Sequence, residues 1–209
     1  MSEPSGAAQE IEGLAEGVLH WTLEDDRIDF RSEAYAVRSP SGWVLIDPLP
    51  VEGDARQRLE PVAAICLTGG FHQRAAWRYR GQSGALVHAP RGAAGLVEAP
   101  DVWFDGEVDL PGGLRALPRH GPTVPHYVFT FASPSGLVLF CADLLMRRSG
   151  GAFEFVPDEH QDDPERTRES VRDLASQPFE LLCPAHGEPL ARAGSAAIMR
   201  ALETDPRRG

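Results

Sequence analysis

The sequence predicts an α/β (α+β) fold in which a core of two sheet layers is covered by helices. Three observations support this prediction. The chain has 209 residues and is 42% hydrophobic, which suffices for the core of one domain. Short apolar segments with Gly and Pro between them alternate with a few segments of helical spacing. A strand, a Ser-Pro-Ser-Gly turn, a second strand and an Asp occur twice, as a fold with two similar halves would produce.

The first half of the chain is expected to contain mainly strands. The Ser-Pro-Ser-Gly turn at 39–42 separates two apolar segments and predicts a hairpin. The continuous apolar segment 62–67 is typical of a strand that is buried on both faces. A short helix is expected over 75–80. The other strands expected in this half are 34–37, 43–46, 85–88, 102–104 and 114–117.

The second half is expected to repeat the hairpin and then to add helices. Asp163 followed by Pro164 is the pattern of an N-cap and the first residue of a helix. Ser195 is positioned to cap a last amphipathic helix. The elements expected in this half are strands 127–131, 137–141 and 181–183, a helix over 165–176 and the last helix.

Charge and cysteine content limit the environment and the partners of the chain. The net charge is −11 and the pI is about 5.0, which disfavours binding to nucleic acid or to an anionic membrane. No apolar run is long enough to span a bilayer. Cys66, Cys141 and Cys183 lie in apolar stretches without CxxC spacing, so buried free thiols are expected. These features predict a cytoplasmic protein.

The two ends of the chain differ from the middle in composition. Residues 1–17 are polar and acidic and lack the apolar region of a signal peptide. This segment and residues 204–209 are expected to be frayed. The sequence therefore predicts one domain over 18–203.

Four segments carry motifs that occur in the same order in a known family. Residues 43–48 read Trp-Val-Leu-Ile-Asp-Pro, and residues 64–68 read Ala-Ile-Cys-Leu-Thr. Residues 139–145 read Leu-Phe-Cys-Ala-Asp-Leu-Leu, and residues 182–189 read Leu-Cys-Pro-Ala-His-Gly-Glu-Pro. Over roughly residues 18–202 the chain thus resembles the metallo-β-lactamase superfamily. The resemblance implies a four-layer αββα sandwich, and for active members the metal-dependent hydrolysis of esters, thioesters, lactones or phosphodiesters.

The chain departs from this family at its main metal-binding loop. Where the family has H-x-H-x-D-H, residues 69–74 read Gly-Gly-Phe-His-Gln-Arg, so an ungapped alignment loses all four ligands. Pro122 stands at the histidine position of a third ligand segment. Catalytic zinc needs about three protein ligands and an open position for water. The family's dinuclear site is therefore not expected here.

Asp143 and His186 remain as the main candidate metal ligands. His72 stands one position from the second lost histidine, while His120 and His126 flank the third ligand segment, so these three are weaker candidates. Asp47 ends a strand beside the site. The resemblance gives this residue a structural and outer-shell role in the pocket.

Structural alternatives exist for the same residues. Asp143 could bind loop backbone amides, or it could pair with Arg74, whose permanent charge would oppose a dication in this pocket. His186 could be satisfied by backbone groups or by Asp143. Both interpretations of each residue remain open at this point.

The eroded ligand set favours a pseudoenzyme that binds a small molecule or a partner without hydrolysis. The small molecule is expected in the loop cleft between the sheets, without a metal cofactor. The alternative is a metal-dependent hydrolase in which Asp143 and His186 are part of a rebuilt site for one zinc or iron ion. Tryptophans, notably Trp77 and Trp103, could also cover a homo-oligomer interface.

Overall fold

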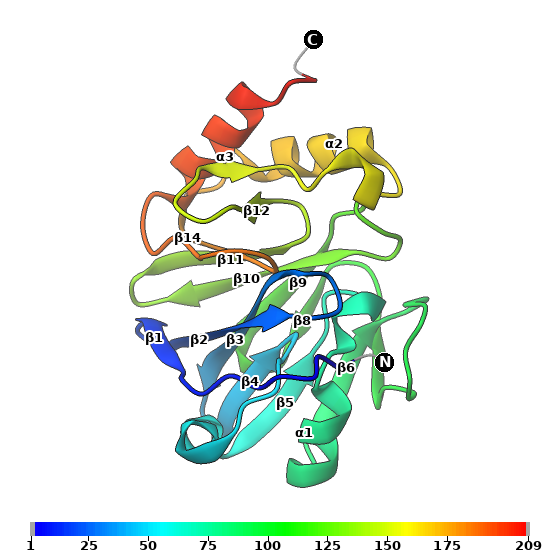
Figure 1. The fold of residues 1–209 in the computed structure, drawn as a ribbon, viewed down its shortest axis with the longest axis vertical. Helices are drawn as coiled ribbons and strands as arrows, with labels where there is room; N and C mark the ends of the chain where they lie inside the picture. The colour runs from blue at the N-terminus through cyan, green and yellow to red at the C-terminus, as the bar shows by residue number, and fades with distance from the viewer. Residues whose placement is uncertain (1–2, 208–209) are drawn as a thin grey trace.

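The structure is a computed structural model, and it describes residues 3–207. It contains two main sheets with helices on their outer faces (Figure 1). The first sheet has the order β1-β2-β3-β4-β5-β6-β7, and the second has the order β14-β11-β10-β9-β8. The strands of the first sheet are β1 (Glu12–Ala15), β2 (Val18–Asp25), β3 (Phe30–Ser39), β4 (Gly42–Ile46), β5 (Val62–Cys66), β6 (Leu86–Pro90) and β7 (Val102–Phe104).

The second sheet follows the first in the chain and carries most of the C-terminal half. Its strands are β8 (Val108–Leu110), β9 (Leu114–Pro118), β10 (Tyr127–Ser133), β11 (Gly136–Ala142) and β14 (Phe179–Pro184). A small ribbon of β12 (Met146–Arg147) and β13 (Phe153–Glu154) lies beside it. The helices are α1 (Ala76–Ser83), α2 (Pro164–Leu174) and α3 (Gly194–Thr204), with short 3₁₀ turns at Gly53–Leu59, Gly70–Gln73, Pro111–Gly113 and Asp158–His160.

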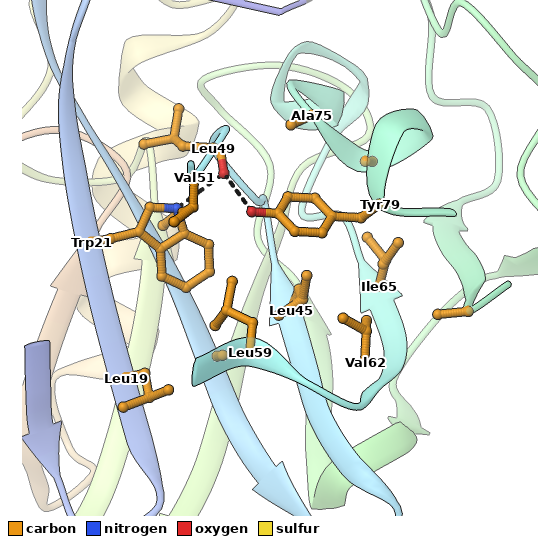
Figure 2. Packing of buried hydrophobic residues seen from close by; sticks show 14 of the residues in the cluster. Leu19, Trp21, Leu45, Leu49, Val51, Leu59, Val62, Ile65, Ala75 and Tyr79 are labelled. Atoms are coloured by element: carbon orange, nitrogen blue, oxygen red, sulfur yellow. Dashed lines mark hydrogen bonds between the residues drawn. The ribbon is translucent and has the colours of Figure 1, made fainter. Parts of the chain in front are cut away.

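Three apolar clusters hold the layers together. One lies between the first sheet and α1, one between the two sheets, and one between the second sheet and α2 with α3. In the first cluster, the Trp21 indole and the Tyr79 hydroxyl both donate to the carbonyl of Leu49, at 3.0 and 3.2 Å (Figure 2). Burial of each large apolar side chain contributes about 1.5–3 kcal/mol. The arrangement confirms the predicted αββα sandwich.

The two Ser-Pro-Ser-Gly turns form equivalent hairpins, one in each sheet. Ser39 donates to the carbonyl of Gly42 at 2.8 Å, and Ser133 donates to that of Gly136 at 2.9 Å. Both glycines have positive φ, 133° and 122°. A Cβ added at Gly42 would collide with the carbonyl of Pro61, and one added at Gly136 with the side chain of Glu180. The second strand of each hairpin then pairs in parallel with a later strand, β5 or β14. The repeat in the sequence therefore reflects two similar halves.

The helices begin as predicted in one case and differently in another. Asp163 caps α2, because its carboxylate accepts the backbone N–H of Arg166 at 2.9 Å. Ser195 does not cap α3, which starts one residue earlier. The hydroxyl of Ser195 donates instead to the carbonyls of Gln177 and Phe179 and fastens α3 to the loop before β14.

The predicted fraying of the two ends is wrong within the described residues. Glu12–Ala15 pairs with β2 as an edge strand, and Ile11 and Ala8 are buried in the first cluster. At the other end, Asp205 is buried and accepts two hydrogen bonds from Arg168, at 2.7 and 3.0 Å. Small apolar contacts and one bidentate ion pair hold segments whose polar composition suggested disorder.

The three cysteines are free and buried, as predicted. Burial raises the pKa of each thiol, so none is ionised at neutral pH. Among residues 3–207, no helix is both long and apolar enough to cross a membrane.

Candidate metal centre

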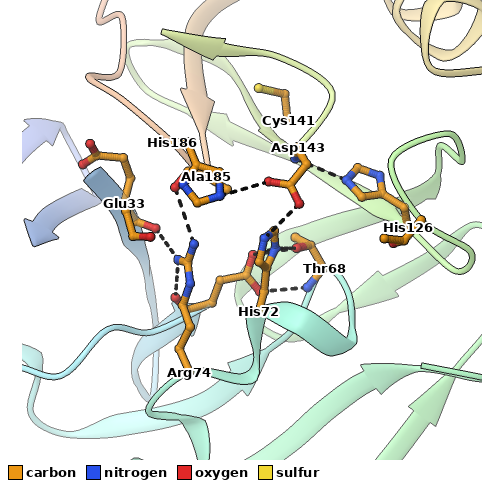
Figure 3. Close-up of polar contacts among 12 residues, drawn as sticks. Glu33, Thr68, His72, Arg74, His126, Cys141, Asp143, Ala185 and His186 are labelled. Atoms are coloured by element: carbon orange, nitrogen blue, oxygen red, sulfur yellow. Dashed lines mark hydrogen bonds and ion pairs between the residues drawn. The ribbon is translucent and has the colours of Figure 1, made fainter. Parts of the chain in front are cut away.

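The candidate site lies at the carboxyl ends of two pairs of parallel strands. Asp47 follows β4 and Thr68 follows β5 in the first sheet, while Asp143 follows β11 and His186 follows β14 in the second. The carboxyl ends of parallel strands commonly hold ligands in open α/β sheets. Figure 3 shows the side chains from both sheets pointing into one space.

Asp47 and Thr68 form a rigid support at this edge. Asp47 accepts the backbone N–H of Thr68 at 2.9 Å and its hydroxyl at 2.6 Å. Because that hydroxyl proton is used, the Thr68 oxygen at 2.8 Å from Nδ1 of His72 accepts a hydrogen bond from the ring. Asp47 Oδ2 lies 3.2 Å from the same Nδ1. These contacts place a proton on Nδ1 and direct Nε2 into the site.

His72 joins the site, although the ungapped alignment placed it between ligand positions. It lies in the 3₁₀ turn Gly70–Gln73, is buried, and places Nε2 3.1 Å from Oδ2 of Asp143. Burial alone would lower the pKa of His72, but the carboxylates of Asp143 and Asp47 raise it to about 9. In the metal-free protein His72 is therefore an imidazolium between two carboxylates.

Asp143 lies at the centre of the side-chain cluster. One oxygen, Oδ2, faces His72, and the other, Oδ1, lies 3.4 Å from Nε2 of His186. Burial raises the pKa of the Asp143 carboxyl, but the nearby His72, His186 and His126 outweigh this effect and hold it well below its usual range. The carboxylate is ionised, and Oδ1 is buried without a hydrogen-bond partner.

His186 presents a lone pair to that unpartnered oxygen. Its Nδ1 lies 3.1 Å from the carbonyl of Arg31, which only accepts hydrogen bonds, so Nδ1 carries the proton of the ring. Burial lowers the pKa of His186 despite the opposing charge of Asp143, so the ring is neutral at pH 7. Nε2 and Asp143 Oδ1 are then two acceptors that face each other, which is favourable only with a cation or a donor between them.

Three residues thus offer ligand atoms for one ion. One ligand atom from each of His72, Asp143 and His186 lies within 4.8 Å of the others. Two imidazoles and one carboxylate form a known ligand set for catalytic zinc and for non-haem iron. The unpartnered oxygen and the neutral His186 fit a dication, and His72 fits once its Nε2 proton has left.

Arg74 binds backbone carbonyls and not the carboxylate of Asp143, the partner that the sequence suggested. Its guanidinium donates to the carbonyls of Glu33 at 2.6 Å, Asp47 at 3.1 Å and Ala185 at 3.5 Å, and among the described residues it makes no ion pair with Asp143. The alternative of an Arg74–Asp143 pair is therefore wrong. Arg74 instead connects β3 to the loops that carry Asp47 and His186.

Two other histidines of the sequence prediction lie beside the cluster. His126 is buried, and its ring nitrogens contact the backbone N–H of Asp143 at 3.2 Å and the carbonyl of Arg119 at 2.7 Å. Burial lowers the pKa of His126 to about 4, so the ring is neutral. His120 accepts the backbone N–H of His126 at 3.4 Å through Nδ1. Neither belongs to the three-residue group.

The backbone around the site adopts unusual conformations. Asp47, Arg74 and Ala142 have φ of 45°, 37° and 48°, a region that residues with a side chain rarely adopt. Such conformations cost about 1–3 kcal/mol each and persist where surrounding contacts enforce them, often at functional sites. The contacts of Thr68 and the carbonyls that bind Arg74 supply that enforcement. The sequence did not predict these roles of Thr68 and Arg74, because neither threonine nor arginine belongs to a metal-binding motif of the chain.

Comparisons with known proteins agree with the fold and define the family. The sequence model of the metallo-beta-lactamase superfamily matches residues 70–186, more than half of the chain. The chain therefore belongs to this superfamily, as the sequence motifs indicated. A comparison with curated proteins found no match.

Solved structures of the superfamily have the same architecture. A DIM-1 metallo-beta-lactamase structure has a TM-score of 0.73 at 15% identity, with 95% of this chain and 98% of that chain covered. The metallo-beta-lactamase from Pontibacter korlensis has a TM-score of 0.72 at 18% identity, with 94% and 99% covered. A superfamily protein from Sulfolobus tokodaii has a TM-score of 0.66 at 14% identity, with 88% and 84% covered. At these identities the likeness concerns the fold.

Proposed function

We propose that this protein binds one divalent transition-metal ion through His72, Asp143 and His186 and is a metal-dependent hydrolase. The observation that carries the proposal is the pair of facing acceptors, Nε2 of His186 and the buried, unpartnered Oδ1 of Asp143. His72, a weaker candidate from the sequence, supplies a third ligand atom beside the two main candidates, which is the number that catalytic zinc requires.

The residues around the ion have separable tasks. A bound zinc ion would lower the pKa of a coordinated water toward 7 and so supply hydroxide at neutral pH. Asp47 and Thr68 keep the proton of His72 on Nδ1, which leaves Nε2 for the ion. The carbonyl of Arg31 does the same for His186. Such partners of ligand histidines fix both tautomer and orientation.

Metal content and hydrolysis test this function together. The purified protein is loaded with Zn²⁺ or Fe²⁺, dialysed, and assayed for bound metal and for turnover of ester, thioester, lactone and phosphodiester substrates. We expect about one ion per chain and turnover that a chelator abolishes, both lost in His186→Ala. His120→Ala is the matched control and should retain both. A protein that retains no metal, or that retains it in His186→Ala, contradicts the proposal.

One observation favours a second function without hydrolysis. In the metal-free state the His72 imidazolium already bridges Asp47 and Asp143, with contacts of 3.2 and 3.1 Å. This chain of two ion pairs can hold the loops without an ion and would leave a small-molecule or partner-binding pseudoenzyme. A metal-free protein that is inert toward the whole substrate panel would support this second function.

A further inference from the structure

His126 touches the proposed ligand Asp143 through its backbone. The amide N–H of Asp143 donates to Nε2 of His126 with an N···N distance of 3.2 Å. On the other side of the ring, Nδ1 lies 2.7 Å from the carbonyl oxygen of Arg119. His126 as a whole is 1% exposed, so water does not compete for either ring nitrogen.

These two partners determine the tautomer of the ring. A carbonyl oxygen accepts only, so Nδ1 must carry a proton, and an amide N–H donates only, so Nε2 must carry a lone pair. Both nitrogens of His126 are thereby used within the protein. The ring has no free lone pair for a metal ion, although its segment corresponds in the sequence to the family's third ligand segment.

The segment that carries His126 is itself firmly held. The backbone N–H of Arg119 donates to the carbonyl of His126 at 2.9 Å. Behind it, the hydroxyl of Ser170 in α2 donates to the carbonyl of His120 at 2.8 Å. Gly121 lies so close to Thr167 of α2 that an added Cβ would be 2.2 Å from the hydroxyl oxygen. The segment of His120 and Gly121 therefore rests on α2, and the adjacent Arg119 pairs with the backbone of His126.

The backbone at Asp143 depends on such an anchor. Ala142, directly before it, has a φ of 48°, which is unfavourable for a residue with a side chain. A hydrogen bond to the next amide opposes relaxation of this turn. The same turn sets the direction of the Asp143 carboxylate, whose two oxygens face His72 and His186.

We propose that His126 is a positioning residue that aligns Asp143 for metal binding by accepting its backbone N–H, and that it is not itself a ligand. The effect of His126 on metal binding rests on the proposed function, whereas its hydrogen bond to the Asp143 amide needs no metal. It also sets the number of protein ligands at three, since both ring nitrogens of His126, the third histidine beside the site, are committed elsewhere.

Two isosteric variants separate the two nitrogens of the ring. In His126→Asn the side-chain amide nitrogen takes the place of Nδ1 and no acceptor faces Asp143. In His126→Gln the side-chain oxygen takes the place of Nε2 and preserves an acceptor for Asp143. NMR of the metal-free proteins reports the exchange of the Asp143 amide and the protonation of the ring nitrogens, and Zn²⁺ titration reports affinity.

The expected pattern differs between the variants. The Asp143 amide stays protected in the wild type and in His126→Gln and exchanges faster in His126→Asn. Zn²⁺ affinity falls about 10–100-fold in His126→Asn, the range typical of lost outer-shell partners, and stays close to wild type in His126→Gln. A purely structural role would change affinity to the same extent in both variants, in step with their urea midpoints.

Besides an equal loss of affinity in both variants, two results would overturn the inference. One is a Zn²⁺-induced shift of Nε2 of His126 that shows direct coordination. The other is an Asp143 amide that exchanges equally fast in all three proteins. If the wild type binds no Zn²⁺, the proposed function fails, but the amide exchange still decides whether His126 holds Asp143.

Discussion

Replacement of Arg74 by Met should destabilise the protein although Arg74 is not one of the proposed metal ligands. The Arg74 side chain is buried and donates to three backbone carbonyls, of Glu33, Asp47 and Ala185. Methionine has a similar length but no donors. The variant leaves these carbonyls without the guanidinium that joins β3 to the two loops of the site.

The distances allow an estimate of the loss. Only the contacts of 2.6 and 3.1 Å have the length of good hydrogen bonds. Hydrogen bonds to a charged group contribute about 1.5–3 kcal/mol each, which gives about 3–6 kcal/mol for two. Removal of the buried charge also removes its desolvation penalty. We therefore expect a net loss of about 2–4 kcal/mol in the free energy of unfolding.

Urea denaturation measures this loss. With a slope of about 2–3 kcal/mol/M for a chain of this size, the midpoint should fall by about 1 M. Arg78→Met is the matched control, because the side chain of Arg78 is 42% exposed and exposed substitutions usually stay within about 0.5 kcal/mol. A loss below about 1 kcal/mol, or one equal to that of Arg78→Met, would refute the role assigned to Arg74.

Two further predictions concern stability away from the ligand atoms. Burial raises the pKa of Asp25, but hydrogen bonds and charge from Arg27 outweigh it and hold that pKa at about 2. Since the pKa of Asp25 is lowered on folding, the carboxylate stabilises the fold above about pH 4 and loses this effect toward about pH 2. The melting temperature of Asp25→Asn should therefore fall less than that of the wild type as the pH is lowered. Gly121→Ala should lower the melting temperature strongly, because its Cβ would overlap Thr167, whereas Gly81→Ala, with open space in α1, should raise it slightly. Equal melting temperatures of these two alanine variants would contradict the packing described for α2.

Most of the fold follows from short-range patterns in the sequence. The hairpin turns at Ser39–Gly42 and Ser133–Gly136 were predictable because serine and glycine at fixed places determine the turn. The edge strand Glu12–Ala15 was not predictable in the same way. Glu12 and Gly13 are exposed and Leu14 and Ala15 only partly buried, and the strand pairs with β2 through its backbone, a contact that residue types alone do not reveal.

The site was predictable in part, for the same reason. Asp143 and His186 end strands in recognisable motifs, and the structure places them together. His72 was assigned a position between ligands because an ungapped alignment assumes the family's loop geometry, whereas the 3₁₀ turn Gly70–Gln73 directs its ring inward. The role of Arg74 depends on carbonyls from three distant segments, and no local pattern contains that information.

X-ray absorption of the zinc-loaded protein counts the imidazoles bound to the ion and so decides whether His72 and His186 both coordinate it. We predict two imidazoles in the wild type and one in His72→Ala, with an oxygen ligand in both. A wild-type centre with one imidazole would contradict the account, because His72 would then not be a ligand. A centre with three would also contradict it, because His126 would then coordinate the ion.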